Sequence, residues 1–151
     1  MAKTMVGILI VSHGNLAQEL LAAGRKIDST LGTQAKALSL DWNVDPEQAK
    51  RDIAQALKEL DSGEGVIVLT DMFGGTPTNL SLAFLDPARS ELVTGVNLPM
   101  VVKLGSLRRD SSWTLKALAR AVAEKGQKSI YVVSEVLERK GGKTGEAGTN
   151  G

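Results

Sequence analysis

The sequence predicts an α/β fold in which a mainly parallel sheet of four to five strands carries helices on both faces. Short apolar segments rich in β-branched residues, typical of strands buried on both sides, recur along the chain. Between them lie segments whose apolar residues recur at helical spacing. This alternation favours right-handed crossovers in a doubly wound sheet, so the expected architecture is flavodoxin-like.

Five segments have the composition of strands. "MVGILIV" and "GVIVLTD" are apolar throughout, whereas "AKALSLDW" is shorter and alternates between apolar and polar residues. "ELVTGVN" and "SIYVVSEVL" complete the set. The expected strands cover residues 5–11, 35–42, 65–71, 91–97 and 129–137.

The helices are predicted from apolar spacing and from their start and stop signals. The first helix follows the first strand and ends near Gly32, and the second begins at Pro46, an allowed first helical residue. A third begins near Pro77. "LPMVVKLGSL" is ambiguous and is interpreted as a short helix, whereas residues 111–126 are clearly amphipathic.

Length and composition indicate one ordinary globular domain. The chain has 151 residues, of which 42% are apolar and 23% are charged. We expect the folded unit to cover residues 1–137. Residues 138–151, "ERKGGKTGEAGTNG", are rich in glycine and nearly devoid of apolar side chains, so a disordered tail is expected.

Charge and residue content exclude several classes of function. A net charge of +1 and only five aromatic residues argue against binding to nucleic acid or to an anionic membrane surface. The absence of cysteine excludes disulfides and thiolate metal sites, and we expect no metal or other cofactor. With neither a signal peptide nor an apolar span of about 20 residues, we expect no membrane insertion and a cytoplasmic location.

The only histidine of the chain follows the first strand directly, in "SHGN". In the expected sheet the first and third strands are neighbours, and their carboxyl ends bring His13 close to Asp71. A carboxylate that accepts a hydrogen bond from one ring nitrogen fixes the imidazole tautomer. The other nitrogen is then free to act as a base, a metal ligand or a nucleophile. A lone loop histidine without a function is the alternative.

The surroundings of this histidine suit a phosphoryl group. Gly14 and the helix start behind it are expected to offer free backbone N–H groups. Gly74, Gly75 and Thr76 precede a second helix start, where the backbone can approach an anion and a hydroxyl can donate to it. Two helix starts beside one histidine would stabilise a phosphohistidine.

Several other residues receive a simpler interpretation. The two tryptophans are expected to be packing residues. Met72 and Phe73 are interpreted as a surface contact patch. Residues 108–110, "RRD", are expected to form a solvated loop.

Three motifs together resemble the enzyme IIA component of the mannose family of the sugar phosphotransferase system. They are "ILIVSHGNLAQELL" at 8–21, "GVIVLTDMFGGTPTNLS" at 65–81 and "VTGVNLPMVVKL" at 93–104. The resemblance runs from about residue 5 to 135. It rests on the order of the motifs, because each of them alone would be a weak signal.

The resemblance implies a function and a set of site residues. His13 would accept a phosphoryl group from the phosphocarrier HPr and pass it to a IIB component, with Asp71 orienting the ring and leaving Nε2 as nucleophile. Thr76 would donate to the phosphate, and Asn79 follows the family pattern. The resemblance further implies a homodimer, in some members with the last strand exchanged. The remaining residues would shape the pocket: Ser12, Gly14, Gly74 and Gly75.

Four other functions fit parts of the sequence. The IIA-like subunit of dihydroxyacetone kinases shares the chemistry but lacks the G-G-[S/T]-P turn. Tetrapyrrole metal chelatases also have an apolar strand ending in His-Gly, yet they usually use more than one histidine. Histidine phosphatases have an arginine at the position of Ser12. A non-catalytic binding module is the fourth. A role in sugar uptake and a regulatory role both remain open.

Overall fold

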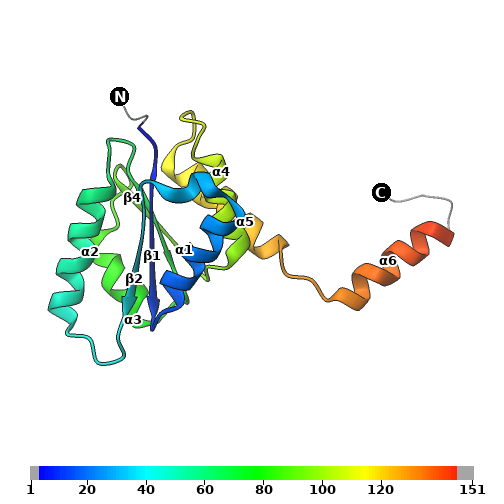
Figure 1. The fold of residues 1–151 in the computed structure, drawn as a ribbon, viewed down its shortest axis with the longest axis horizontal. Coiled ribbons are helices and arrows are strands. Elements are labelled where there is room, and N and C mark those ends of the chain that lie inside the picture. Colours follow the sequence, from blue (N-terminus) through cyan, green and yellow to red (C-terminus); the bar gives the residue numbers. More distant parts are fainter. Residues whose placement is uncertain (1–3, 146–151) are drawn as a thin grey trace.

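The computed structural model describes residues 4–145. They form a sheet with helices on both of its faces, and a further helix that lies apart from this body (Figure 1). The sheet has four parallel strands in the order β2-β1-β3-β4. The elements in chain order are β1 (Gly7–His13), α1 (Leu16–Ile27), η1 (Ser29–Gly32), β2 (Ala35–Leu40), α2 (Pro46–Leu60), β3 (Val66–Thr70), α3 (Thr76–Ser81), η2 (Leu82–Phe84), β4 (Ser90–Thr94), α4 (Leu98–Leu107), α5 (Leu115–Lys128) and α6 (Val133–Gly145).

This topology confirms the predicted flavodoxin-like, doubly wound class. The chain passes from β1 outward to β2 and then crosses back to β3 on the other side of β1. The point at which the order reverses therefore lies between β1 and β3. In such sheets, ligands and reactive groups gather at the carboxyl ends of the strands beside that point.

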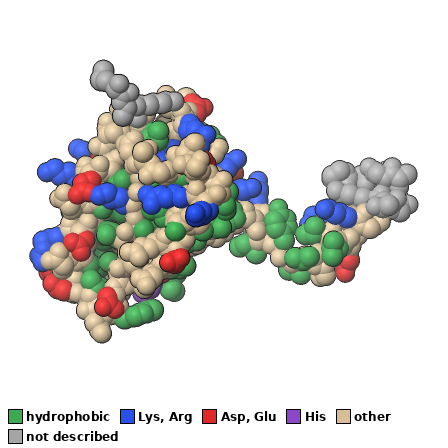
Figure 2. Space-filling view, viewed as in Figure 1, with side chains coloured by type: hydrophobic (Ala, Val, Ile, Leu, Met, Phe, Trp, Pro, Cys, Tyr) green, Lys and Arg blue, Asp and Glu red, His purple; other side chains and the backbone are tan. Residues whose placement is uncertain are grey.

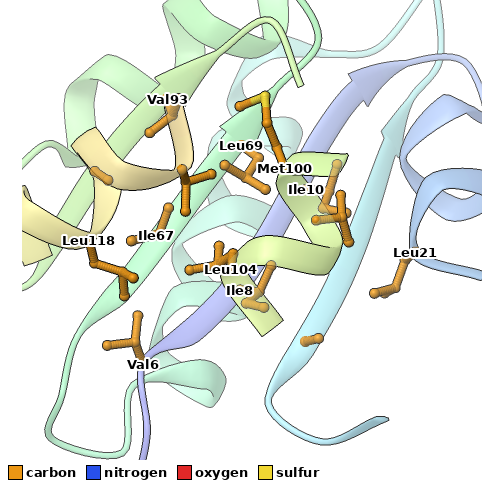
Figure 3. Close-up of a cluster of buried hydrophobic side chains, with 14 of the residues drawn as sticks. Val6, Ile8, Ile10, Leu21, Ile67, Leu69, Val93, Met100, Leu104 and Leu118 are labelled. Carbon is orange, nitrogen blue, oxygen red and sulfur yellow. The ribbon is translucent and has the colours of Figure 1, made fainter. Parts of the chain in front are cut away.

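Both faces of the sheet are buried, as the apolar strands require. Alternate residues of β1 and β3 point to opposite faces, so each strand supplies two cores. One core packs the sheet against α1, α4 and α5 (Figure 3). The other packs it against α2 and α3.

The helix predicted for "LPMVVKLGSL" is confirmed as α4. Asn97 caps it, since its side-chain oxygen accepts a hydrogen bond from the N–H of Met100 at 3.1 Å. Pro99 occupies the first turn of the helix, where no intrahelical N–H is needed. The two local signals explain why an apolar stretch without clear periodicity becomes a helix.

The strand predicted at 129–137 is wrong in this structure. Residues 129–132 have no regular secondary structure and lead to α6, which projects from the body (Figure 1). Glutamate, leucine, arginine and lysine in "SEVLERK" are good helix formers, and in this structure the segment does not pair with the open sheet edge at β4.

Helix α6 also crosses residue 137, where the sequence predicts the end of the folded unit. Residues 138–145 belong to α6 in this structure, and the rest of the expected tail, 146–151, lies outside the described residues. The division of the chain at residue 137 and the disordered tail after it both stay predictions.

The sequence predicts that Arg108 lies in a solvated loop, and this prediction is wrong. Arg108 is buried, with 3% of its surface exposed. Its guanidinium donates hydrogen bonds to the carbonyls of Val6, Thr33 and Gln34 at 2.7–3.0 Å. These carbonyls lie at the amino ends of β1 and β2. Burial lowers the pKa of Arg108 to about 10, and the neighbouring charge of Arg109 acts in the same direction.

Replacing Arg108 with leucine is expected to lower the free energy of unfolding by about 3 kcal/mol, because three buried carbonyls lose their donor. Chemical denaturation monitored by circular dichroism measures this change. Arg109→Leu is the matched control, since this exposed neighbour pairs with Asp28 at the surface and its loss should cost under about 1 kcal/mol. Equal losses in the two variants would show that Arg108 does not hold the strand ends.

Candidate active site

The structure brings His13 and Asp71 together at the carboxyl end of the sheet. His13 is the last residue of β1, and Asp71 follows the last residue of β3. The ring Nδ1 of His13 lies 2.7 Å from Oδ2 of Asp71. The same oxygen accepts the backbone N–H of His13 at 2.9 Å. The proximity predicted from the strand order is therefore confirmed.

The surroundings of the Asp71 carboxyl favour its ionised form. Burial acts to raise its pKa, but the hydrogen bonds from the backbone and ring of His13 outweigh this effect. The pKa of Asp71 is thus held below its ordinary value of 3.8. An ionised carboxylate on Nδ1 favours the tautomer in which Nδ1 carries the proton and Nε2 carries the lone pair.

Ser12 and Gly14 shape the loop that carries His13. The buried hydroxyl of Ser12 accepts the N–H of Ala17 at 2.6 Å and so fixes the start of α1 behind the histidine. Gly14 has a φ of +53°, a conformation that favours glycine. Its N–H donates to the carbonyl of Leu40 at 2.8 Å, so the expectation that this N–H is free is wrong.

The loop after β3 closes the other side of the site. A Cβ on Gly75 would lie 2.8 Å from Cε1 of His13, so only glycine allows the backbone to approach the ring this closely. Gly74 precedes it, and Thr76 is exposed as the first residue of α3. The side chain of Asn79 donates to the carbonyl of Gly74 at 3.5 Å across this turn.

Thr78 is a supporting residue that the sequence analysis missed. Its buried hydroxyl donates to the carbonyl of Met72 at 2.6 Å and pairs with the hydroxyl of Thr70, also at 2.6 Å. These contacts tie the loop to the end of β3, and the loop carries Asp71 and Gly75. A threonine in "GGTPTN" gives no sign of this role, because the pairing depends on how the loop folds.

Trp42 is a second residue missed from the sequence. It was expected to be a packing residue, yet its side chain is 77% exposed. The indole stacks on the imidazole of His13, with ring centroids 5.0 Å apart and planes inclined by 25°. The residue lies just after β2, the strand that pairs with β1.

The loop after β3 also exposes two large apolar side chains near the histidine. Phe73 is 78% exposed and Met72 is 54% exposed, and both follow Asp71 directly. In Figure 2, the histidine is seen at the edge of the body beside exposed hydrophobic side chains. This exposure agrees with the interpretation of the pair as a contact patch.

Within residues 4–145, no group of three or more His, Cys, Asp or Glu side chains is arranged to hold a metal ion. No helix among the same residues has the length and apolarity needed to cross a membrane.

Comparisons with known proteins agree with the geometry. Residues 7–123 match the family model described as the PTS system fructose IIA component. The chain is 38% identical over 138 residues to the PTS system fructose-specific EIIA component of Bacillus subtilis, covering 89% of this chain and 91% of the relative.

Two further relatives extend the comparison. The chain is 31% identical over 129 residues to the PTS system mannose-specific EIIAB component of Escherichia coli, covering 83% of this chain and 38% of the relative. Among solved structures, the PTS IIA protein associated with the fucose utilization operon of Streptococcus pneumoniae has a TM-score of 0.74 and 31% identity. The similarity covers 91% of this chain and 99% of that one.

Proposed function

Since the chain belongs to the mannose-type IIA family of the sugar phosphotransferase system, we propose that it is a phosphocarrier acting through His13. It accepts a phosphoryl group from phospho-HPr and passes it to a histidine or cysteine of a IIB component. The observation that supports this most directly is the 2.7 Å contact between Nδ1 of His13 and Asp71. That contact leaves Nε2 as the ring atom available for reaction.

The transfer step follows from this arrangement. The lone pair on Nε2 attacks the phosphorus of phosphohistidine on HPr, a new N–P bond forms, and the old N–P bond breaks. Its electron pair returns to the imidazole of HPr. Because Nδ1 keeps its proton, the ring of His13 becomes positively charged as the new bond forms. The ionised Asp71 stabilises that charge without taking up a proton.

The phosphoryl group is proposed to lie against the loop after β3. Gly75 leaves room beside the ring, and Thr76 is exposed where its hydroxyl can donate to a phosphate oxygen. The first N–H groups of a helix have no intrahelical acceptor, which favours an anion at the start of α3. Gly74 and Asn79 hold the turn in this shape.

The proposal that a IIB component is the acceptor rests on membership of the family. No residue of this chain indicates which sugar is involved. The Escherichia coli relative is an EIIAB component, of which this chain matches 38%. Phosphoryl transfer to IIB serves sugar uptake or, through the phosphorylation state of His13, a regulatory signal. The expected cytoplasmic location also stays a prediction.

Intact-mass measurement after incubation with phosphoenolpyruvate, enzyme I and HPr tests the proposed function. The expected result is a gain of one phosphate that is stable at alkaline pH and lost in acid, as phosphohistidine is. Omitting HPr should prevent the gain. An unmodified mass in the presence of active enzyme I and HPr would refute the proposal.

We further propose that the protein is a homodimer in which the segment after α5 pairs with the partner subunit. Strand β4 is the edge of the sheet, with one side unpaired among the described strands. Residues 130–133, "IYVV", are rich in β-branched residues and each is at least 58% exposed. A strand from a second copy would cover both the open edge and this apolar segment.

Replacing Ile130 and Val132 together with lysine is expected to convert the dimer into a monomer, because the change places two charges in the proposed pairing segment. Size-exclusion chromatography with light scattering measures the mass. As a matched control, Lys58 and Gln55 on the exposed side of α2 are changed to alanine and should leave the dimer intact. A monomeric parent protein would rule out the dimer.

A further inference from the structure

We propose that Trp42 is a positioning residue for phosphoryl transfer, which holds the imidazole plane of His13 by stacking on it. The inference rests on the proposed function of His13. It assigns a role in that reaction to a residue of the loop after β2.

The stacking contact is built into the sheet. Strand β2 pairs with β1 in a register that sets Leu40 opposite His13. The carbonyl of Leu40 then accepts the N–H of Gly14, which ties the two strand ends together beyond the last paired residues. Trp42 follows two residues later, and Asp41 accepts its backbone N–H at 2.8 Å. The indole is therefore delivered to the histidine by the pairing of the strands.

The exposure of this side chain argues against a packing role. An indole left 77% exposed gives up most of the free energy that its burial in a core would supply. Its one ring contact among the described residues is with His13, at a centroid distance of 5.0 Å. The residue is thus placed where it acts on the imidazole rather than where it stabilises the fold.

Stacking restrains a motion that Asp71 controls only in part. The torsion that rotates an imidazole about its bond to Cβ is broad, and the hydrogen bond at Nδ1 fixes one point of the ring. The indole lies against a face of the ring, and Gly75 lies against the edge at Cε1. Together these contacts define a slot that fixes the direction of Nε2. An in-line attack depends on that direction.

The indole also favours the charge that develops during the step. As the N–P bond forms, the imidazole becomes cationic, and the face of an indole attracts a cation. This attraction is stronger in the transition state than in the neutral ring, so it accelerates transfer. An aliphatic side chain of similar size would supply neither the flat surface nor this attraction.

Rapid-quench measurement of transfer from phospho-HPr, at saturating and limiting donor, tests the proposal. Trp42→Ala is expected to lower the saturating rate about fivefold, which corresponds to roughly 1 kcal/mol. Trp42→Phe, which keeps an aromatic face, should recover the rate to within about twofold, whereas Trp42→Leu should not. An unchanged saturating rate in Trp42→Ala, or equal rates in the leucine and phenylalanine variants, would overturn the proposal.

Phe73→Ala is the matched control, since Phe73 is as exposed as Trp42 and lies in the contact patch. Its loss is expected to raise the donor concentration for half-saturation and not to lower the saturating rate. If the two alanine variants both change only half-saturation, Trp42 acts in docking and the proposal fails.

A second measurement examines the stack without any transfer. In proton NMR, the Cε1–H signal of His13 should be shifted upfield by the ring current of the indole and should move downfield in Trp42→Ala. The absence of this difference would overturn the proposal. A wild-type protein that shows the ring-current shift but accepts no phosphoryl group would refute the proposed function itself.

Discussion

The His13→Gln variant is expected to show no gain of phosphate under conditions in which the wild-type protein is fully modified. His13 is the only histidine of the chain, and there is no cysteine to replace it as nucleophile. A glutamine amide has no lone pair of comparable nucleophilicity. Intact mass and acid lability, measured side by side for the two proteins, give the result.

A missing phosphate gain in His13→Gln can be assigned to the lost imidazole only if the variant keeps the wild-type fold. The imidazole is partly exposed, with 22% of its side-chain surface accessible, so its replacement should leave the core unchanged. Circular dichroism and the unfolding midpoint check this. A phosphate gain that persists in a folded His13→Gln protein would contradict the assignment and would direct attention to the carboxylate of Asp71 as an acyl phosphate.

Asp71→Ala is expected to remain folded and to accept the phosphoryl group about 100-fold more slowly. The variant loses the partner of Nδ1 and the acceptor of the backbone N–H of His13. Partners that orient a reactive imidazole are typically worth about 10- to 100-fold, and the developing charge also loses its counter-ion. Rapid quench with saturating phospho-HPr measures the rate.

Asp71→Asn separates the contribution of ring orientation from that of charge stabilisation. Its amide oxygen can still accept both hydrogen bonds of His13, while the negative charge is lost. The expected rate lies between those of the wild type and Asp71→Ala. Equal rates in all three proteins would mean that Asp71 neither orients the ring nor stabilises its charge.

The sheet and the meeting of His13 with Asp71 were predictable because they depend on short-range pattern and on strand order. Two apolar strands end in "SH" and "TD", and in a doubly wound sheet the carboxyl ends of adjacent strands meet. The helix over "LPMVVKLGSL" was similarly marked by a cap and a proline. The signal for the helix is local, whereas the meeting of His13 and Asp71 follows from the order of the strands.

The residues that were missed depend on contacts distant in sequence. Arg108 reaches carbonyls 74–102 residues away, and "RRD" in a loop looks solvated without that knowledge. Trp42 stacks on a ring delivered by another strand, and Thr78 pairs with a hydroxyl eight residues earlier. Periodicity and composition carry no information about such pairs.

The strand prediction for residues 129–137 was wrong for a different reason. Its β-branched residues have strand propensity, but a strand forms only where the segment pairs with a sheet edge, and within one chain this segment does not pair with the open edge of β4. In a single chain it continues into α6, and residues 130–133 stay exposed (Figure 2). In the proposed dimer, this segment would pair with an open sheet edge of the partner subunit.

The identity of the phosphorylated nitrogen tests the central claim most directly. Nitrogen-15 NMR of labelled, phosphorylated protein, at alkaline pH where phosphohistidine is stable, distinguishes the two ring positions of His13. Because Asp71 occupies Nδ1 at 2.7 Å, the phosphoryl group is predicted on Nε2, with Nδ1 still protonated. A phosphoryl group on Nδ1 would contradict the account, because Asp71 could then not be the residue that orients the ring.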